Sequence, residues 1–172
     1  GSFSETTTMS GSASFQIGAV DESAITEAVT ATYSYDVDLN TSFTGDDNLY
    51  VGIETGNSTS SIDFTLDSSG GGGNTLSVTS MYYQFPLGSY ELAVGPTLDS
   101  DDLMPTTTSK YSDSFFFGSQ YGLASNYFAS QGTGAGLAVA RTFDNGWNTS
   151  GSVIATGGSS AAGILTKEGI DV

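Results

Sequence analysis

Long stretches of this chain alternate strictly between apolar and polar side chains. From 9 to 19 the odd positions read Met, Gly, Ala, Phe, Ile, Ala, and the even positions read Ser, Ser, Ser, Gln, Gly. From 29 to 43 the odd positions are apolar except for Thr41, and the even positions are Thr, Ser, Asp and Asn. Successive side chains of a strand point to opposite faces, so each stretch is predicted to be one strand with an apolar and a polar face.

Five further segments have strand-like patterns, and no window favours a helix. They span 49–54, 75–85, 90–94, 136–142 and 147–155. In the second of these the apolar set changes parity near Thr79 and Ser80, which predicts a β-bulge at that point. The chain is therefore predicted to be all-β with about seven strands.

The connections between these strands alternate in length. The turns at 44–48, 86–89 and 144–146 are short, whereas the connections between them are long and rich in Gly, Ser or Thr. A meander with its short turns at one end and its long loops at the other is typical of outer-membrane barrels. Sandwiches with Greek-key crossings do not usually sort their loops in this way. We therefore expect an antiparallel up-and-down transmembrane β-barrel, with 1–172 as a single domain.

Each short turn has an aromatic residue on both sides. The pairs are Phe43 and Tyr50, Phe85 and Tyr90, and Phe143 and Trp147. Tyr and Trp favour the boundary between membrane and water, so three such turns at one end predict a belt of interface aromatics. The alternative is that aromatic residues simply favour strand ends and hairpin packing.

The composition excludes several classes of function. The chain has no His and no Cys, which rules out a Ser–His–Asp triad, histidine-ligated zinc and cysteine metal sites. Nineteen acidic residues against three basic ones give a net charge of -16, which argues against nucleic-acid binding and predicts attraction of cations. We therefore expect neither an enzyme nor a metal or cofactor site.

The termini and hydropathy add two expectations. No stretch approaches the ~20 apolar residues of a membrane helix. The opening GSFSETTT has neither a basic region nor an apolar run, and the chain lacks an initiator Met, so we expect a processed chain without a signal peptide.

Several segments, in order along most of the chain, resemble the cyanobacterial outer-membrane porins. They are FSETTTMSGSASFQIGA at the start, TSFTGDDNL followed by IETGN, MYYQFPLGSYELAVG, and ILTKEGID near the end. In that family a Thr-Ser-Phe-Thr-Gly-Lys/Asp-Asp run precedes a strand, and a Tyr-Gln-Phe-Pro-Leu/Ile-Gly hairpin follows. These runs are not generic strand sequences.

The resemblance implies a trimeric, water-filled barrel in the outer membrane, of the group described as carbohydrate-selective or iron-uptake porins. Family members carry a surface-layer-homology domain and a coiled coil before the barrel, and we expect neither within residues 1–172. The family barrel is also roughly twice as long, and Val172 comes just before an expected further strand. Seven strands would leave two open edges in hydrocarbon, so we expect this chain to be the N-terminal part of a barrel. Either the barrel continues in sequence beyond these strands, or other copies of the chain complete it by pairing first strand to last.

Acidic residues on the polar face and in the longest loop are the candidate pore residues. We expect Asp36, Asp38, Glu54 and Glu91 to line the lumen. In many porins the third outer loop narrows the channel, and here it would run from about Pro96 to Thr133. Its charged residues are predicted to form the constriction: Asp99, Asp101, Asp102, Lys110 and Asp113. Carboxylates there would favour cations over anions.

Two alternatives to the constriction stay open. The loop acids could be solvated without touching a pore, and Asp99 to Asp102 could bind Ca²⁺, although their spacing matches no known calcium loop.

The function favoured by the sequence is a cation-preferring diffusion pore for small solutes or inorganic ions, with iron among the candidates. Its predicted partners are outer-membrane lipid and further copies of the chain, and no nucleic acid. The alternative is a structural or adhesive, acidic β-sheet protein of the cell envelope. A lectin-like sandwich has little support, because the loops sort by length.

Overall fold

The computed structural model describes residues 6–19, 29–57, 73–99, 102–103, 133–158 and 170–171. These residues form eight strands and no helix. The strands are β1 (Thr7–Ala19), β2 (Val29–Thr41), β3 (Asn48–Gly56), β4 (Ser77–Leu87), β5 (Tyr90–Asp99), β6 (Thr133–Thr142), β7 (Asn148–Ala155) and β8 (Ile170–Asp171). The all-β prediction is confirmed for this part of the chain, and the two-residue β8 adds a strand to the seven expected.

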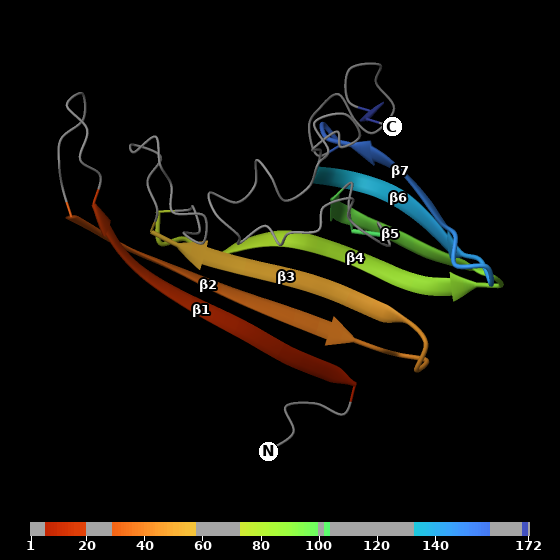
Figure 1. The fold of residues 1–172 in the computed structure, drawn as a ribbon, viewed down its shortest axis with the longest axis horizontal. Coiled ribbons are helices and arrows are strands. Elements are labelled where there is room, and N and C mark those ends of the chain that lie inside the picture. Colours follow the sequence, from red (N-terminus) through yellow and green to blue (C-terminus); the bar gives the residue numbers. More distant parts are fainter. Residues whose placement is uncertain are drawn as a thin grey trace.

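The strands form one antiparallel sheet in which every strand pairs with its neighbour in sequence. The order is β1-β2-β3-β4-β5-β6-β7-β8, so no connection crosses the sheet. The turns β2–β3, β4–β5 and β6–β7 therefore lie together at one end, as Figure 1 shows on its right side. The expected meander is confirmed. The sheet is open, with β1 and β8 at its two edges.

The register keeps the two expected faces separate from strand to strand. Met9 lies opposite Leu39, and Leu39 lies opposite Val51. On the other face Ser12 lies opposite Asp36, which in turn lies opposite Glu54. We call these the apolar face and the acidic face. A one-residue slip would exchange them, so the alternation itself selects this register.

A bulge preserves the faces where the sequence changes parity. The register of β3 and β4 shifts between Gly52 and Ile53, which lie opposite Ser80 and Val78. The extra residue, Thr79, allows Val78 and Met81 to share the apolar face. The predicted bulge near Thr79 is therefore confirmed, and its role is to correct the phase of β4.

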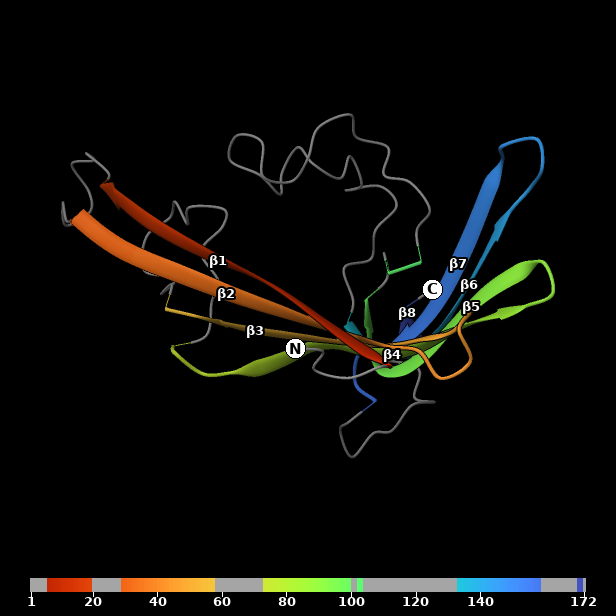
Figure 2. The same cartoon turned by 90° about the horizontal axis from the view of Figure 1, so that it is seen from below.

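The sheet is curved, and the acidic face is its concave side. Figure 2 shows the strands bending around the short segment 102–103. Leu103 packs against buried residues of the acidic face, which places that face on the inside of the curve. The cluster it contacts consists of Tyr82, Ala93, Leu98, Ala138 and Ile154.

Glycine residues permit this curvature. Gly95 on β5 lies opposite Gly136 on β6. A methyl group at Gly95 would lie 2.6 Å from the Cα of Tyr82, and one at Gly136 would lie 2.7 Å from the carbonyl oxygen of Val153. Neighbouring backbones therefore approach more closely here than any other residue would allow, which is how glycine bends a sheet.

Candidate functional site: an acidic concave face

All four predicted lumen acids lie on the acidic face. Asp36 and Asp38 project from β2, Glu54 from β3 and Glu91 from β5, and the register places Asp36 directly opposite Glu54. Side chains directly opposite each other have Cβ atoms about 4.5–5.5 Å apart, a distance at which like charges repel. The concave face therefore carries several carboxylates. Two of them, Asp36 and Glu54, lie directly opposite each other, an arrangement that would be unfavourable in an interior without water.

Hydroxyl groups hold part of this row in place. The Tyr50 hydroxyl donates to Oδ1 of Asp38 at 2.7 Å, and the Ser10 hydroxyl lies 3.5 Å from Oδ2 of the same carboxylate. The Ser12 hydroxyl lies 3.3 Å from Oδ2 of Asp36. These contacts orient the two β2 carboxylates, which stay partly accessible.

Tyr50 belongs to this acidic face and not to the aromatic group with which the sequence placed it. Its ring lies 5.2 Å from that of Tyr82, and it packs against the buried cluster. The sequence contained the signal: Tyr50 stands at an even position between Leu49 and Val51, both of which face the other way.

The other predicted belt residues gather at the short-turn end of the apolar face or in the adjoining turns. Phe85 lies opposite Leu92 on the apolar face, and Tyr90 lies opposite Leu87. Phe43 and Trp147 are exposed in their turns. Tyr83, which the prediction omitted, joins them, with its ring 5.5 Å from Phe85 and 6.4 Å from Phe43.

Asp47 organises the β2–β3 turn. Its Oδ1 accepts hydrogen bonds from the Ser42 hydroxyl and from the backbone N–H groups of Phe43 and Thr44, at 2.9, 2.9 and 2.7 Å. Its Oδ2 accepts one from the Tyr83 hydroxyl at 2.6 Å, which ties the turn to β4. These hydrogen bonds, above all that from Tyr83, hold the pKa of Asp47 well below its ordinary value, against the opposing effect of its burial.

The longest connection starts at a different point from the one expected. β5 continues past Pro96 to Asp99 because its register with β6 shifts between Gly95 and Leu98, which accommodates a residue that lacks an N–H group. Asp99 is thus the last residue of the strand, where its carboxylate accepts a hydrogen bond from Thr133 at 3.2 Å, and the expectation that it lies in the loop is wrong.

The first described residues of that connection turn onto the concave face. The Asp102 carboxylate accepts a hydrogen bond from the backbone N–H of Asp99 at 2.6 Å, and Leu103 packs on the cluster of the acidic face. Asp101, Lys110 and Asp113 lie outside the described residues. Within the described ranges no group of three or more acidic side chains is placed to hold a metal ion.

The apolar face exposes large apolar side chains on every long strand except β3. Exposed apolar residues on this face include Met9, Phe15, Ile17 and Val29 on β1 and β2, Val78 and Leu87 on β4, Tyr90 and Val94 on β5, Leu137 and Val139 on β6, and Val153 on β7. Phe15 and Ile17 are 83% and 79% exposed. Among the described residues only six apolar side chains are buried, all near β4 to β7. None of the described segments forms a helix that is long and apolar enough to cross a membrane.

We compared the chain with known protein families, curated proteins and solved structures. No protein-family model, no curated protein and no solved structure matches the chain.

Proposed function

We propose that this chain forms part of the wall of a water-filled outer-membrane pore that prefers cations and passes small solutes or inorganic ions, iron among them. The observation that carries the proposal is the apolar face, which exposes large apolar side chains on six of the seven long strands, all except β3. The sequence resemblance to the cyanobacterial porins supports the same function and adds a trimeric assembly.

The apolar face is what a barrel presents to lipid. A soluble monomer rarely exposes contiguous apolar patches beyond a few hundred Å², and a soluble single sheet needs a second layer to cover one. Strands β1 to β6 have 9 to 13 residues. A tilted strand of about 9–11 residues crosses the hydrocarbon region. The edges at β1 and β8 would then be paired by further strands, since hydrocarbon does not tolerate open edges.

The concave face has the chemistry of a cation pathway. Water or mobile cations between Asp36 and Glu54 would reduce the repulsion that their register imposes, and a water-filled lumen supplies both. Carboxylates lining such a lumen lower the barrier to cations and raise it to anions. The turn of Asp102 and Leu103 onto this face supports a connection that narrows the lumen.

Conductance across a planar bilayer tests the proposal. The full chain, assembled in membranes, should conduct, and its reversal potential under a salt gradient should indicate cation preference. Replacing Asp36 by Asn and Glu54 by Gln should reduce that preference. The reduction should be larger in dilute salt, because the screening length is about 30 Å at 0.01 M and about 3 Å at 1 M.

Asp144→Asn is the matched control, because Asp144 lies in the β6–β7 turn and is exposed. It removes one charge outside the strands and should leave selectivity unchanged. Anion preference in the unmodified protein, or an equal effect of Asp144→Asn, would overturn the assignment of the concave face to the lumen. A chain that stays in the aqueous phase when detergent is separated, and does not conduct, would instead favour the structural or adhesive alternative.

A further inference from the structure

A cation, Arg141, lies on the apolar face, away from the carboxylates of the acidic face. Arg141 is the only Lys or Arg in the described ranges, in a chain of net charge -16. It lies opposite Thr149, on the same face as Val139, and is the last residue but one of β6. No carboxylate of the described residues lies within 4.0 Å of its guanidinium. A charge in this position, on an apolar face, has no anion from the described part of the chain.

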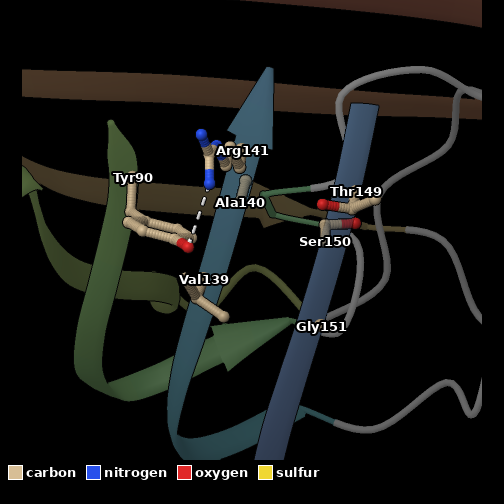
Figure 3. Close-up of a pocket in the computed structure, with 7 residues that line it drawn as sticks. All are labelled: Tyr90, Val139, Ala140, Arg141, Thr149, Ser150 and Gly151. Atoms are coloured by element: carbon tan, nitrogen blue, oxygen red, sulfur yellow. Dashed lines mark hydrogen bonds between the residues drawn. The ribbon is translucent and has the colours of Figure 1, made fainter. Parts of the chain in front are cut away.

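Aromatic groups position the guanidinium without neutralising it. Its central carbon lies 4.4 Å from the ring centroid of Phe143 and 5.0 Å from that of Tyr90. Its Nη1 donates to the Tyr90 hydroxyl at 3.1 Å, the contact that Figure 3 marks with a dashed line. Within the described part of the chain its Nε is buried and has no acceptor. The rings favour the cation. Nε is too buried to meet an external anion, so the Nη groups are the donors that could bind an anionic acceptor.

A depression adjoins this group on the same face. It has a volume of about 240 Å³ and is lined by Tyr90, Val139, Ala140, Arg141, Thr149, Ser150 and Gly151. Figure 3 shows that its walls come from β5, β6 and β7. Gly151 lines it without a side chain, and a methyl group added there would meet no atom within 4 Å, so the space next to Gly151 is free. The depression therefore combines one cation, a Thr hydroxyl and an apolar wall at Val139.

We infer that the depression at Arg141 binds the phosphate of an anionic phospholipid headgroup, with the acyl chain along Val139. The inference rests on the proposed function, because it requires the apolar face to contact lipid. The site lies at the strand ends that adjoin the short turns, because Tyr90 begins β5, Arg141 is the last residue but one of β6 and Thr149 is the second residue of β7. Headgroups meet a membrane-spanning sheet at this level. Guanidinium groups pair with phosphate through two parallel hydrogen bonds, which would supply the missing anion.

The sole tryptophan of the chain provides a probe at this site. Trp147 is exposed in the β6–β7 turn, which immediately precedes the strand that carries Thr149. In vesicles, quenching of its fluorescence by phospholipids with brominated acyl chains measures which lipid lies beside it. We expect phosphatidylglycerol to be preferred over phosphatidylcholine by about fivefold, the effect of one cation near an anionic surface.

Variants separate the charge from the shape of the site. Arg141→Gln should lower the preference to near one, whereas Arg141→Lys should keep part of it. Gly151→Leu should also lower it, because the side chain fills the depression while Arg141 is unchanged. A preference that Arg141→Gln and Gly151→Leu both leave intact would overturn the inference. So would displacement of phosphatidylglycerol by millimolar inorganic phosphate, but not by chloride of equal ionic strength, because the site would then take free phosphate.

The outcomes also distinguish this inference from the function on which it rests. Equal quenching by both lipids in the unmodified protein refutes the headgroup site alone. An absence of quenching by either lipid means that Trp147 does not lie in a membrane, and it refutes the pore proposal together with the site.

Discussion

A single methyl group at Gly136 should destabilise the sheet, although glycine is usually the weakest residue in a strand. Gly136 lies on β6 between Gly95 on β5 and Ile154 on β7. A Cβ atom there would lie 2.7 Å from the carbonyl oxygen of Val153 and 3.1 Å from Cγ1 of Ile154. The first contact is with backbone, so no side-chain rotation relieves it, and β7 must shift.

The magnitude follows from two opposing effects. Overpacking that forces backbone shifts costs roughly 1–3 kcal/mol. Replacing Gly by Ala reduces the conformational entropy of the unfolded chain, which gains about 0.4–1 kcal/mol. The net change for Gly136→Ala is therefore a loss of about 1–2 kcal/mol of unfolding free energy. For a chain of this size, that lowers Tm by roughly 2–8 °C.

Gly151→Ala is the matched control on the adjacent strand. Gly151, on β7, lies opposite Val139 on β6. Its φ is not in the left-handed region, and an added Cβ would meet no atom within 4 Å. Only the unfolded-state effect remains, so we expect a gain of about 0.4–1 kcal/mol.

Urea unfolding in detergent or vesicles, followed by Trp147 fluorescence, measures both variants. Opposite signs for Gly136→Ala and Gly151→Ala would support the close backbone approach at Gly136. Equal stabilisation by both would refute it, because it would mean that β6 and β7 are not in contact at this point. Gly95→Ala, which meets the backbone of Tyr82, should behave like Gly136→Ala.

Three further changes test other parts of the structure. The lowered pKa of Asp47 contributes stability that is fully present above its unfolded value of about 3.9 and is lost as pH falls through the lower folded value; Asp47→Asn and Tyr83→Phe should each flatten that loss in acid-unfolding curves, and an unchanged curve would mean that the turn carboxylate is not hydrogen-bonded. Ile154→Ala, at a side chain 1% exposed, should cost about 2–5 kcal/mol, whereas Val153→Ala, at one 48% exposed, should cost much less under the same conditions; equal costs would contradict the assignment of the two faces. Leu103→Asp should release the start of the long connection from the acidic face and raise single-channel conductance, and an unchanged conductance would place that connection outside the lumen.

The faces and the order of the strands could be read from the sequence because both depend on local pattern. The alternation around Tyr33 and Val37 assigns each side chain to one face of a strand, and this assignment cannot change without a bulge. Even the bulge at Thr79 was visible, because the apolar positions change parity there. Connection lengths then predicted the meander, since strands joined by tight turns must pair with each other.

Features that depend on separate strands meeting in space could not be predicted in this way. The Tyr83 hydroxyl reaches Asp47 across 36 positions, and Arg141 meets Tyr90 across 51. From the sequence, Pro96 suggested that the strand ends there. β5 instead continues to Asp99, because its register against β6 shifts between Gly95 and Leu98. Each of these contacts requires the register of a neighbouring strand, and local propensity carries no information about it.

Sequence by itself determined that this chain forms an antiparallel sheet with one apolar and one acidic face, because a period of two dictates the side of every residue. Tertiary structure decided which face is concave, because curvature arises where Gly95 and Gly136 allow the backbones of β4 to β7 to approach. That curvature buries Ala93 and Ile154 on the acidic face, leaves Phe15 and Ile17 exposed on the other, and sets Arg141 beside an open depression among apolar neighbours. Close packing of backbones across several strands is a property of the assembled sheet, and no single segment of the chain contains it.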